Sequence, residues 1–126
     1  MTSLQQEKEL VLDFLNNIYK AKNQNLVETI SRYTSDDFHM RCTHPFNELK
    51  WAENVANDLW IPIKNSFKPI QRRMDIFYAG TNLRDNHSSK WVVNMGHLLG
   101  IFNNPFLGIQ PTRKAVILLY CEFYRV

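Results

Sequence analysis

Apolar residues recur at helical spacing in the first part of the chain and at strand spacing in the second. Between Leu10 and Ile18 they fall on one helical face, which predicts a first helix capped by Ser3 and running to about Ala21. Leucine, valine, isoleucine and tyrosine share one face of residues 26–33, so a short second helix is predicted there.

A third helix is predicted after a small strand. Residues 38–43 (FHMRCT) read as the strand, and a His-Pro loop follows because a residue before proline disfavours the helical region. The third helix is then expected from about Glu48 to Phe67, with Pro62 kinking or dividing it.

In the rest of the chain, apolar and polar residues mostly alternate with a period of two. Strands are predicted over residues 70–79, 90–102 and 115–126, joined by a turn at 81–89 and a long loop at 103–114. Helices that precede a run of strands indicate an α+β fold, with an antiparallel sheet covered on one side by helices.

Composition narrows the class of protein. The 126 residues, 44% of them hydrophobic, make one globular domain spanning residues 1–126. The net charge of +3 is spread along the chain, which argues against a nucleic-acid partner. No apolar stretch has the length of a membrane span and Met1–Leu10 is not a secretory signal, so we expect no membrane partner and a cytoplasmic location. Cys42 and Cys121 are then expected to be buried free thiols.

Glu122 is the first candidate for chemistry, because it interrupts the apolar terminal run AVILLYCEFYRV. A buried carboxylate is costly unless it is paired or its pKa is raised. It could pair with Arg125 or with an arginine of the neighbouring strand. Alternatively it could face a pocket together with Tyr120 and Tyr124, which share its face of the strand.

Three further polar residues stand near apolar ones. His97 shares a strand face with methionine and leucine, Asp75 precedes an apolar pair, and His44 lies in the loop that enters the third helix. Each residue also has a structural alternative. His97 could be a core histidine whose hydrogen bonds are satisfied, and Asp75 could be a surface carboxylate that pairs with Arg73. His44 could fix the loop by bonding backbone groups. The histidines lack the spacing of a metal site, so no metal is expected.

Three segments together resemble the SnoaL-like polyketide cyclase group of the nuclear transport factor two-like superfamily. They are HPFNEL at residues 44–49 with LWIPI downstream, GH at 96–97 followed by GIF and LGIQPT, and EFYR at 122–125. The chain differs where Trp51 and Arg113 replace glycines that the family usually has. The family's chain also continues through another strand after the Tyr-Arg pair, so we expect a partner strand to be missing after Val126.

The resemblance implies a cone-shaped α+β barrel, with a curved antiparallel sheet wrapped around three N-terminal helices and an interior pocket. It implies an enzyme without metal or cofactor, in which Glu122 is the general acid/base and His97 polarises a carbonyl of the substrate. The candidate substrate-binding residues are His44, Trp60, Asp75, Tyr120 and Tyr124.

The hypothesis is therefore a cofactor-independent enzyme that performs aldol-type cyclisation or isomerisation next to the carbonyl of a small apolar ligand. The alternative is a non-catalytic ligand-binding or dimerisation module of the same fold. A homodimer is expected in either case, because the terminal strand is apolar on both of its faces.

Overall fold

The computed structural model describes residues 3–126, and its first two helices lie where the sequence predicts them. Helix α1 spans Gln5–Lys20, and α2 spans Leu26–Tyr33 after a short 3-10 turn, η1, at Asn23–Asn25. The capping role expected of Ser3 is wrong, because Leu4 occupies the cap position and makes no side-chain cap hydrogen bond. Burial of one apolar face holds α1 in place instead.

The next segment begins with a hairpin. Strand β1 (His39–Arg41) pairs antiparallel with β2 (Glu48–Lys50), so residues expected to begin the third helix form a strand. A continuous helical segment then comprises α3 (Trp51–Asn54), a π-helical stretch η2 (Val55–Trp60) and α4 (Ile61–Ser66). The π-helical stretch ends just before Pro62, which has no N–H to continue the regular bonding pattern.

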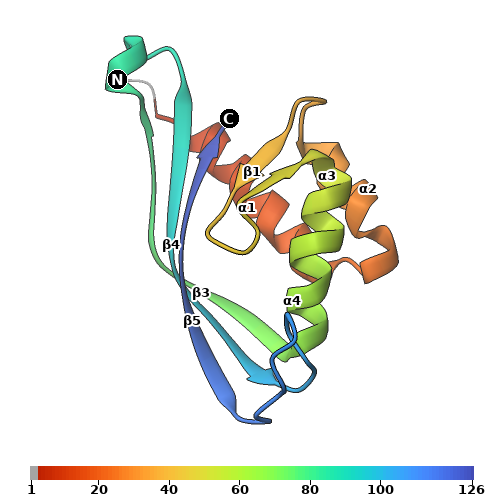
Figure 1. The fold of residues 1–126 in the computed structure, drawn as a ribbon. Helices are drawn as coiled ribbons and strands as arrows, with labels where there is room; N and C mark the ends of the chain where they lie inside the picture. Colours follow the sequence, from red (N-terminus) through yellow and green to blue (C-terminus); the bar gives the residue numbers. More distant parts are fainter. Residues whose placement is uncertain (1–2) are drawn as a thin grey trace.

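Three long strands form the main sheet. They are β3 (Phe67–Thr81), β4 (Lys90–Phe102) and β5 (Ala115–Arg125), antiparallel in the order β3-β4-β5, with a short 3-10 turn, η3 (Leu83–Asp85), between the first two. Figure 1 shows that all three strands bend and that the helices lie on one side of them. The predicted α+β fold with a curved antiparallel sheet is confirmed. Within residues 3–126 the strands do not close into a barrel, since β3 and β5 are both edges.

The two faces of this sheet differ sharply in burial. On the inner face, toward the helices, β4 contributes a row of buried residues: Val92, Asn94, Gly96, Leu98 and Phe102. On the outer face large apolar side chains remain exposed: Ile76, Tyr78, Ile117, Leu119 and Phe123. The outer face is thus an uncovered apolar surface.

The core joins the helices to one another and to the sheet. One buried cluster gathers side chains from α1, α2, β2 and the helical segment 51–66, including Ile18, Ile30 and Trp60. A second cluster packs Val11 and Leu15 of α1 against Val92 of β4. Across residues 3–126, no helix combines the length and the apolar character needed to cross a bilayer.

Gly96 allows β3 and β5 to approach the centre of β4. A Cβ atom there would lie 2.0 Å from the main-chain oxygen of Arg73, whereas a Cβ at Gly80 would meet no atom within 4 Å. We therefore expect Gly96→Ala to lower the free energy of unfolding by about 3 kcal/mol or more, through overpacking. Gly80→Ala, the matched control, should change it by less than about 1 kcal/mol. Urea denaturation of both variants tests this, and equal effects would contradict it.

Candidate functional site

The inner face carries a buried ion pair that crosses the sheet. Glu122 of β5 lies opposite Asn94 of β4, and its carboxylate receives two hydrogen bonds from Arg72 of β3. The Nη1–Oε2 distance is 2.7 Å and the Nη2–Oε1 distance is 3.1 Å. The side chains of Arg72 and Glu122 are only 6% and 13% exposed. Of the two alternatives open from the sequence, pairing is therefore realised, with Arg72 and not Arg125 as the partner.

Aromatic rings enclose the Arg72 guanidinium. Its Cζ lies 4.3 Å from the ring centroid of Tyr120, 5.4 Å from that of Tyr19 and 5.8 Å from that of Trp60. Each ring face attracts the cation. Burial alone would lower the pKa of Arg72, but the Glu122 carboxylate outweighs burial and raises this pKa above its usual value. The guanidinium therefore stays charged inside an aromatic enclosure.

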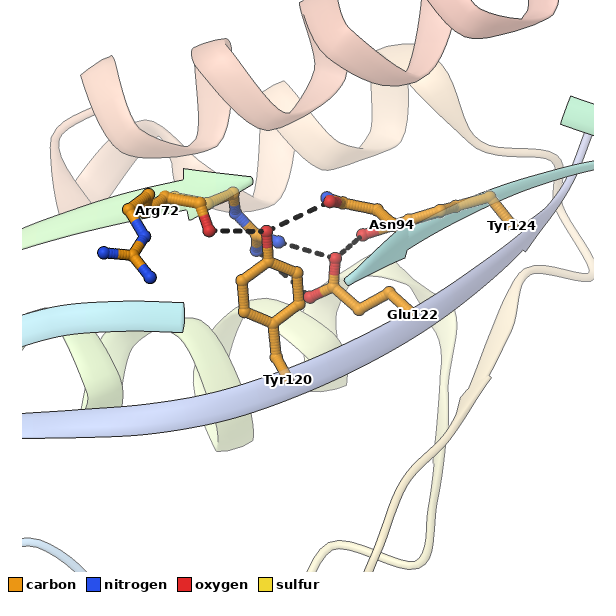
Figure 2. Close-up of polar contacts among 6 residues, drawn as sticks. Arg72, Asn94, Tyr120, Glu122 and Tyr124 are labelled. Atoms are coloured by element: carbon orange, nitrogen blue, oxygen red, sulfur yellow. Dashed lines mark hydrogen bonds and ion pairs between the residues drawn. The ribbon is translucent and has the colours of Figure 1, made fainter. Parts of the chain in front are cut away.

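Two tyrosines and an asparagine complete the cluster, as Figure 2 shows. The Tyr124 hydroxyl donates to Oε2 of Glu122, and the Tyr120 hydroxyl donates to Oδ1 of Asn94 at 3.0 Å. Burial raises the pKa of Tyr124 well above its usual value, and the nearby Glu122 carboxylate raises it further. Tyr120 lies beside Gly96, whose missing side chain leaves room for the hydroxyl. We call Tyr19, Trp60, Arg72, Asn94, Tyr120, Glu122 and Tyr124 the inner cluster.

Three polar atoms of the inner cluster are buried without a hydrogen-bond partner. They are the Tyr19 hydroxyl, Nε of Arg72 and Nδ2 of Asn94. Buried polar groups in folded proteins are nearly always bonded, and an unbonded one costs about 1–3 kcal/mol. Two of these three atoms are N–H donors, so the inner cluster can still donate hydrogen bonds.

His97 and Asp75 lie on the opposite face of the sheet. Nδ1 of His97 is 2.9 Å from Oδ2 of Asp75, and Nε of Arg73 is 3.3 Å from Oδ1 of the same carboxylate. In the strand register His97 is paired with Leu119, whose side chain is exposed on the outer face. Glu122 is paired with Asn94, whose side chain is buried on the inner face. The expectation that His97 and Asp75 line an interior with Glu122 is therefore wrong, because strand alternation separates them.

The remaining predicted residues divide between the two environments. Trp60, Tyr120 and Tyr124 join the inner cluster, whereas His44 is exposed in the loop between β1 and β2. Cys42 is half-buried, and burial raises the pKa of its thiol. Cys121 is exposed, contrary to expectation, because it lies on the outer face of β5.

Sequence reasoning missed Arg72, Asn94 and Tyr19. The Lys64–Arg73 segment reads as a solvated strand entry, yet alternation turns Arg72 inward and Arg73 outward. The available signal was the adjacent arginine pair itself, since neighbouring residues of a strand face opposite sides. Asn94 also carried a signal, because it is the one polar side chain on its face of β4 between Val92 and Phe102.

Neither of the two best-defined surface depressions reaches the inner cluster. One, of about 330 Å³, lies over polar side chains of α1 and α2. The other, of about 410 Å³, lies on the sheet near Pro69, Leu99 and Ile117. In the part of the chain that the structure describes, no three His, Cys, Asp or Glu side chains gather as a metal site would require.

Comparisons with known proteins add no relative. No protein-family model, no curated protein and no solved structure matches the chain.

The ion pair gives a prediction about stability. Arg72→Met leaves a buried carboxylate without its partner, so we expect a loss of about 3–5 kcal/mol in the free energy of unfolding. The double variant Arg72→Met/Glu122→Leu removes both charges and should recover most of that loss. Arg84→Met, in an exposed turn, is the control and should cost less than about 0.5 kcal/mol. Chemical denaturation of the unsubstituted protein and the three variants tests this, and a double variant no more stable than Arg72→Met would contradict it.

The raised pKa of Tyr124 gives a prediction about pH. Above its usual pKa of about 10, the unfolded chain loses the tyrosine proton before the folded chain does. The stabilisation is therefore complete below about pH 10 and declines as the pH rises further. Tyr124→Phe should flatten this alkaline decline, whereas Tyr78→Phe on the outer face should leave it unchanged. Unfolding free energies measured between about pH 8 and 11 test this, and an equal decline in Tyr124→Phe and the unsubstituted protein would contradict it.

Proposed function

We propose that the inner cluster binds a small, largely apolar carbonyl compound and that Glu122 moves a proton next to the carbonyl. The observation that carries this proposal is the Arg72–Glu122 pair, buried among aromatic side chains on the sheet face that the helices cover. Ligand sites typically combine apolar and aromatic walls with a few convergent polar groups. The interior pocket and cone-shaped enclosure expected from the sequence are part of this proposal.

The unused hydrogen-bonding atoms support a ligand with acceptor oxygens. Nδ2 of Asn94 and Nε of Arg72 are N–H donors without partners, and the Tyr19 hydroxyl can donate as well. A carbonyl oxygen accepts such bonds and contributes no competing donor. Binding would therefore satisfy groups that are costly to leave unbonded.

The proposed chemistry is a proton transfer with a developing oxyanion. Oε1 or Oε2 of Glu122 accepts the proton from the carbon next to the carbonyl, and the electron pair moves onto the carbonyl oxygen. Tyr120 or Asn94 donates a hydrogen bond to that oxygen, as oxyanion-stabilising groups do. Return of the proton at another carbon completes an isomerisation. For an aldol-type ring closure, the enolate carbon attacks a second carbonyl and the proton held by Glu122 passes to the resulting alkoxide, which regenerates the carboxylate.

Backbone geometry supports the resemblance on which the chemistry rests. Trp51 and Arg113, which replace the family's usual glycines, have φ angles of 64° and 59°. These values lie in the left-handed region that glycine adopts without steric cost. The backbone thus has a glycine-like conformation at both positions where the sequence departs from the family.

The second candidate is a non-catalytic ligand-binding or dimerisation module. The bidentate bond to Arg72 favours it, because three hydrogen bonds from Arg72 and Tyr124 already occupy most of the acceptor positions of the Glu122 carboxylate. Both candidates are proposed without a metal, a cofactor, a nucleic acid or a membrane partner, and with a cytoplasmic location.

An exchange assay tests the chemistry without knowledge of the full reaction. Ketones and diketones that raise the melting temperature are incubated with the protein in D₂O, and deuterium entry next to the carbonyl is followed by NMR. We expect Glu122→Gln to slow this exchange about 10²–10⁴-fold, because glutamine keeps the shape of the side chain but does not act as a base. Ligand affinity should change little.

Cys121→Ser is the matched control, since Cys121 is the sequence neighbour of Glu122 on the opposite face of β5. Its exchange rate should equal that of the unsubstituted protein. Unchanged exchange in Glu122→Gln would remove the base assignment and favour the binding module.

A further inference from the structure

Lys64 joins the end of helix α1 to helix α4. Its Nζ donates one hydrogen bond to the main-chain oxygen of Ile18, at 2.8 Å, and another to that of Ala21. Both oxygens lie at the C-terminal end of α1, where the last carbonyl groups of a helix have no partner within the helix. The helix dipole also favours a cation at this end. The ammonium group of Lys64 thus holds the last turn of α1 against α4.

Two aromatic residues of the inner cluster lie next to this junction. Tyr19 follows Ile18, whose oxygen accepts from Lys64. Trp60 lies four residues before Lys64, at the spacing that brings two side chains to the same side of a helix. The two rings meet edge to face at a centroid distance of 5.8 Å, and both lie beside the Arg72 guanidinium. The hydrogen bonds of Lys64 therefore connect the two segments that carry these rings.

The direction of the Tyr19 hydroxyl depends on the backbone beneath it. This hydroxyl is buried and makes no hydrogen bond within residues 3–126. No partner atom therefore fixes it, and its place is set by the packing of the ring and by the last turn of α1. Lys64 bonds the main chain of that same turn.

We propose that Lys64 is a positioning residue for ligand binding, because its two hydrogen bonds fix the last turn of α1 so that the Tyr19 hydroxyl meets an acceptor oxygen of the ligand. This inference rests on the proposed function, since it takes the ligand to be a carbonyl compound bound at the inner cluster. Lys64 acts through Tyr19, because its own ammonium group is bonded to main-chain oxygens. A hydrogen bond made equally in the ground and transition states contributes to KM and not to kcat.

A second hydrogen bond provides a matched control. Nδ2 of Asn23 donates to Oδ1 of Asn65 at 2.7 Å, which ties α4 to the exposed turn η1. Asn65→Ala removes this bond and loosens the same junction, but it leaves Lys64 bonded to the turn that carries Tyr19. Lys64→Met keeps the length and the apolar stem of the side chain and removes its N–H donors. A general effect of loosening α4 would appear in both variants, whereas a positioning effect would appear only in Lys64→Met.

A double-variant cycle with acetophenone, a small apolar ketone, tests the role in binding. Lys64→Met and Tyr19→Phe should each raise its Kd, and the KM of its deuterium exchange, about three- to tenfold, as the loss of one neutral hydrogen bond does. The kcat of exchange should stay within about twofold in both. Lys64→Met/Tyr19→Phe should raise Kd no further, because both changes remove the same bond. Effects that multiply in the double variant, an unchanged KM in Lys64→Met, or an equal rise in Asn65→Ala would overturn the proposal.

NMR of the ligand-free protein separates failure of this inference from failure of the proposed function. In Lys64→Met the Nε–H proton signal of Arg72 should move downfield, because the Tyr19 ring no longer stays beside the guanidinium. Asn65→Ala should leave that signal in place. An unmoved signal in Lys64→Met would overturn the positioning role whether or not acetophenone binds. A moved signal in a protein whose unsubstituted form binds no acetophenone would overturn the proposed function instead. If Lys64→Met does not fold, Lys64→Gln, with an uncharged side chain one bond shorter, takes its place in both experiments.

Discussion

The buried ion pair between Arg72 and Glu122 is the interaction on which the inner side of this protein depends. It joins the two edge strands of the sheet across β4, and it brings two charges under the helices. Such a pair is costly to desolvate, and its geometry has to compensate. Here the compensation comes from two hydrogen bonds between the charges, the Tyr124 hydroxyl and three aromatic rings around the guanidinium. The surrounding residues thus offset the cost of burying the two charges.

Strand alternation then separates two environments that are adjacent in the sequence. Arg72 turns inward to Glu122, and Arg73 turns outward to Asp75. A shift of register by one residue would exchange the two faces, so the pairing of β3 with β4 determines both sites at once. The absence of a side chain at Gly96 is part of this pairing, because the main chain of Arg73 lies against it. The inner cluster and the outer face are thus two consequences of one register.

Much of the fold follows from local patterns. The limits of β4 and of α2 agree with the periodicity of apolar residues, and so does the order of helices before strands. Local patterns do not reveal which face of a strand meets the helices, and that choice separates His97 from Glu122. The β-bulge between Met74 and Ile76 shifts the alternation within β3, which is why Asp75 could not be placed from the sequence.

The candidate site was predictable only in part. Glu122, Tyr120 and Tyr124 share one face of one strand, so simple alternation brings them together. Arg72 joins them from 50 residues earlier in the chain. That contact depends on the order of strands in the sheet and on the lack of a side chain at Gly96, which no short segment encodes. The catalytic role assigned to Glu122 remains a proposal that rests on this contact and on the resemblance.

The most direct test of this account is the state of the Arg72 guanidinium in solution. Nitrogen-15 NMR of the arginine side chains, with the Arg72 signal assigned by its loss in Arg72→Lys, reports both burial and surroundings. The account predicts slow exchange of the Arg72 N–H protons with water and an upfield shift caused by the rings of Tyr19, Trp60 and Tyr120. An Arg72 signal that exchanges and averages like those of the exposed arginines would contradict the buried ion pair, and the proposed site with it.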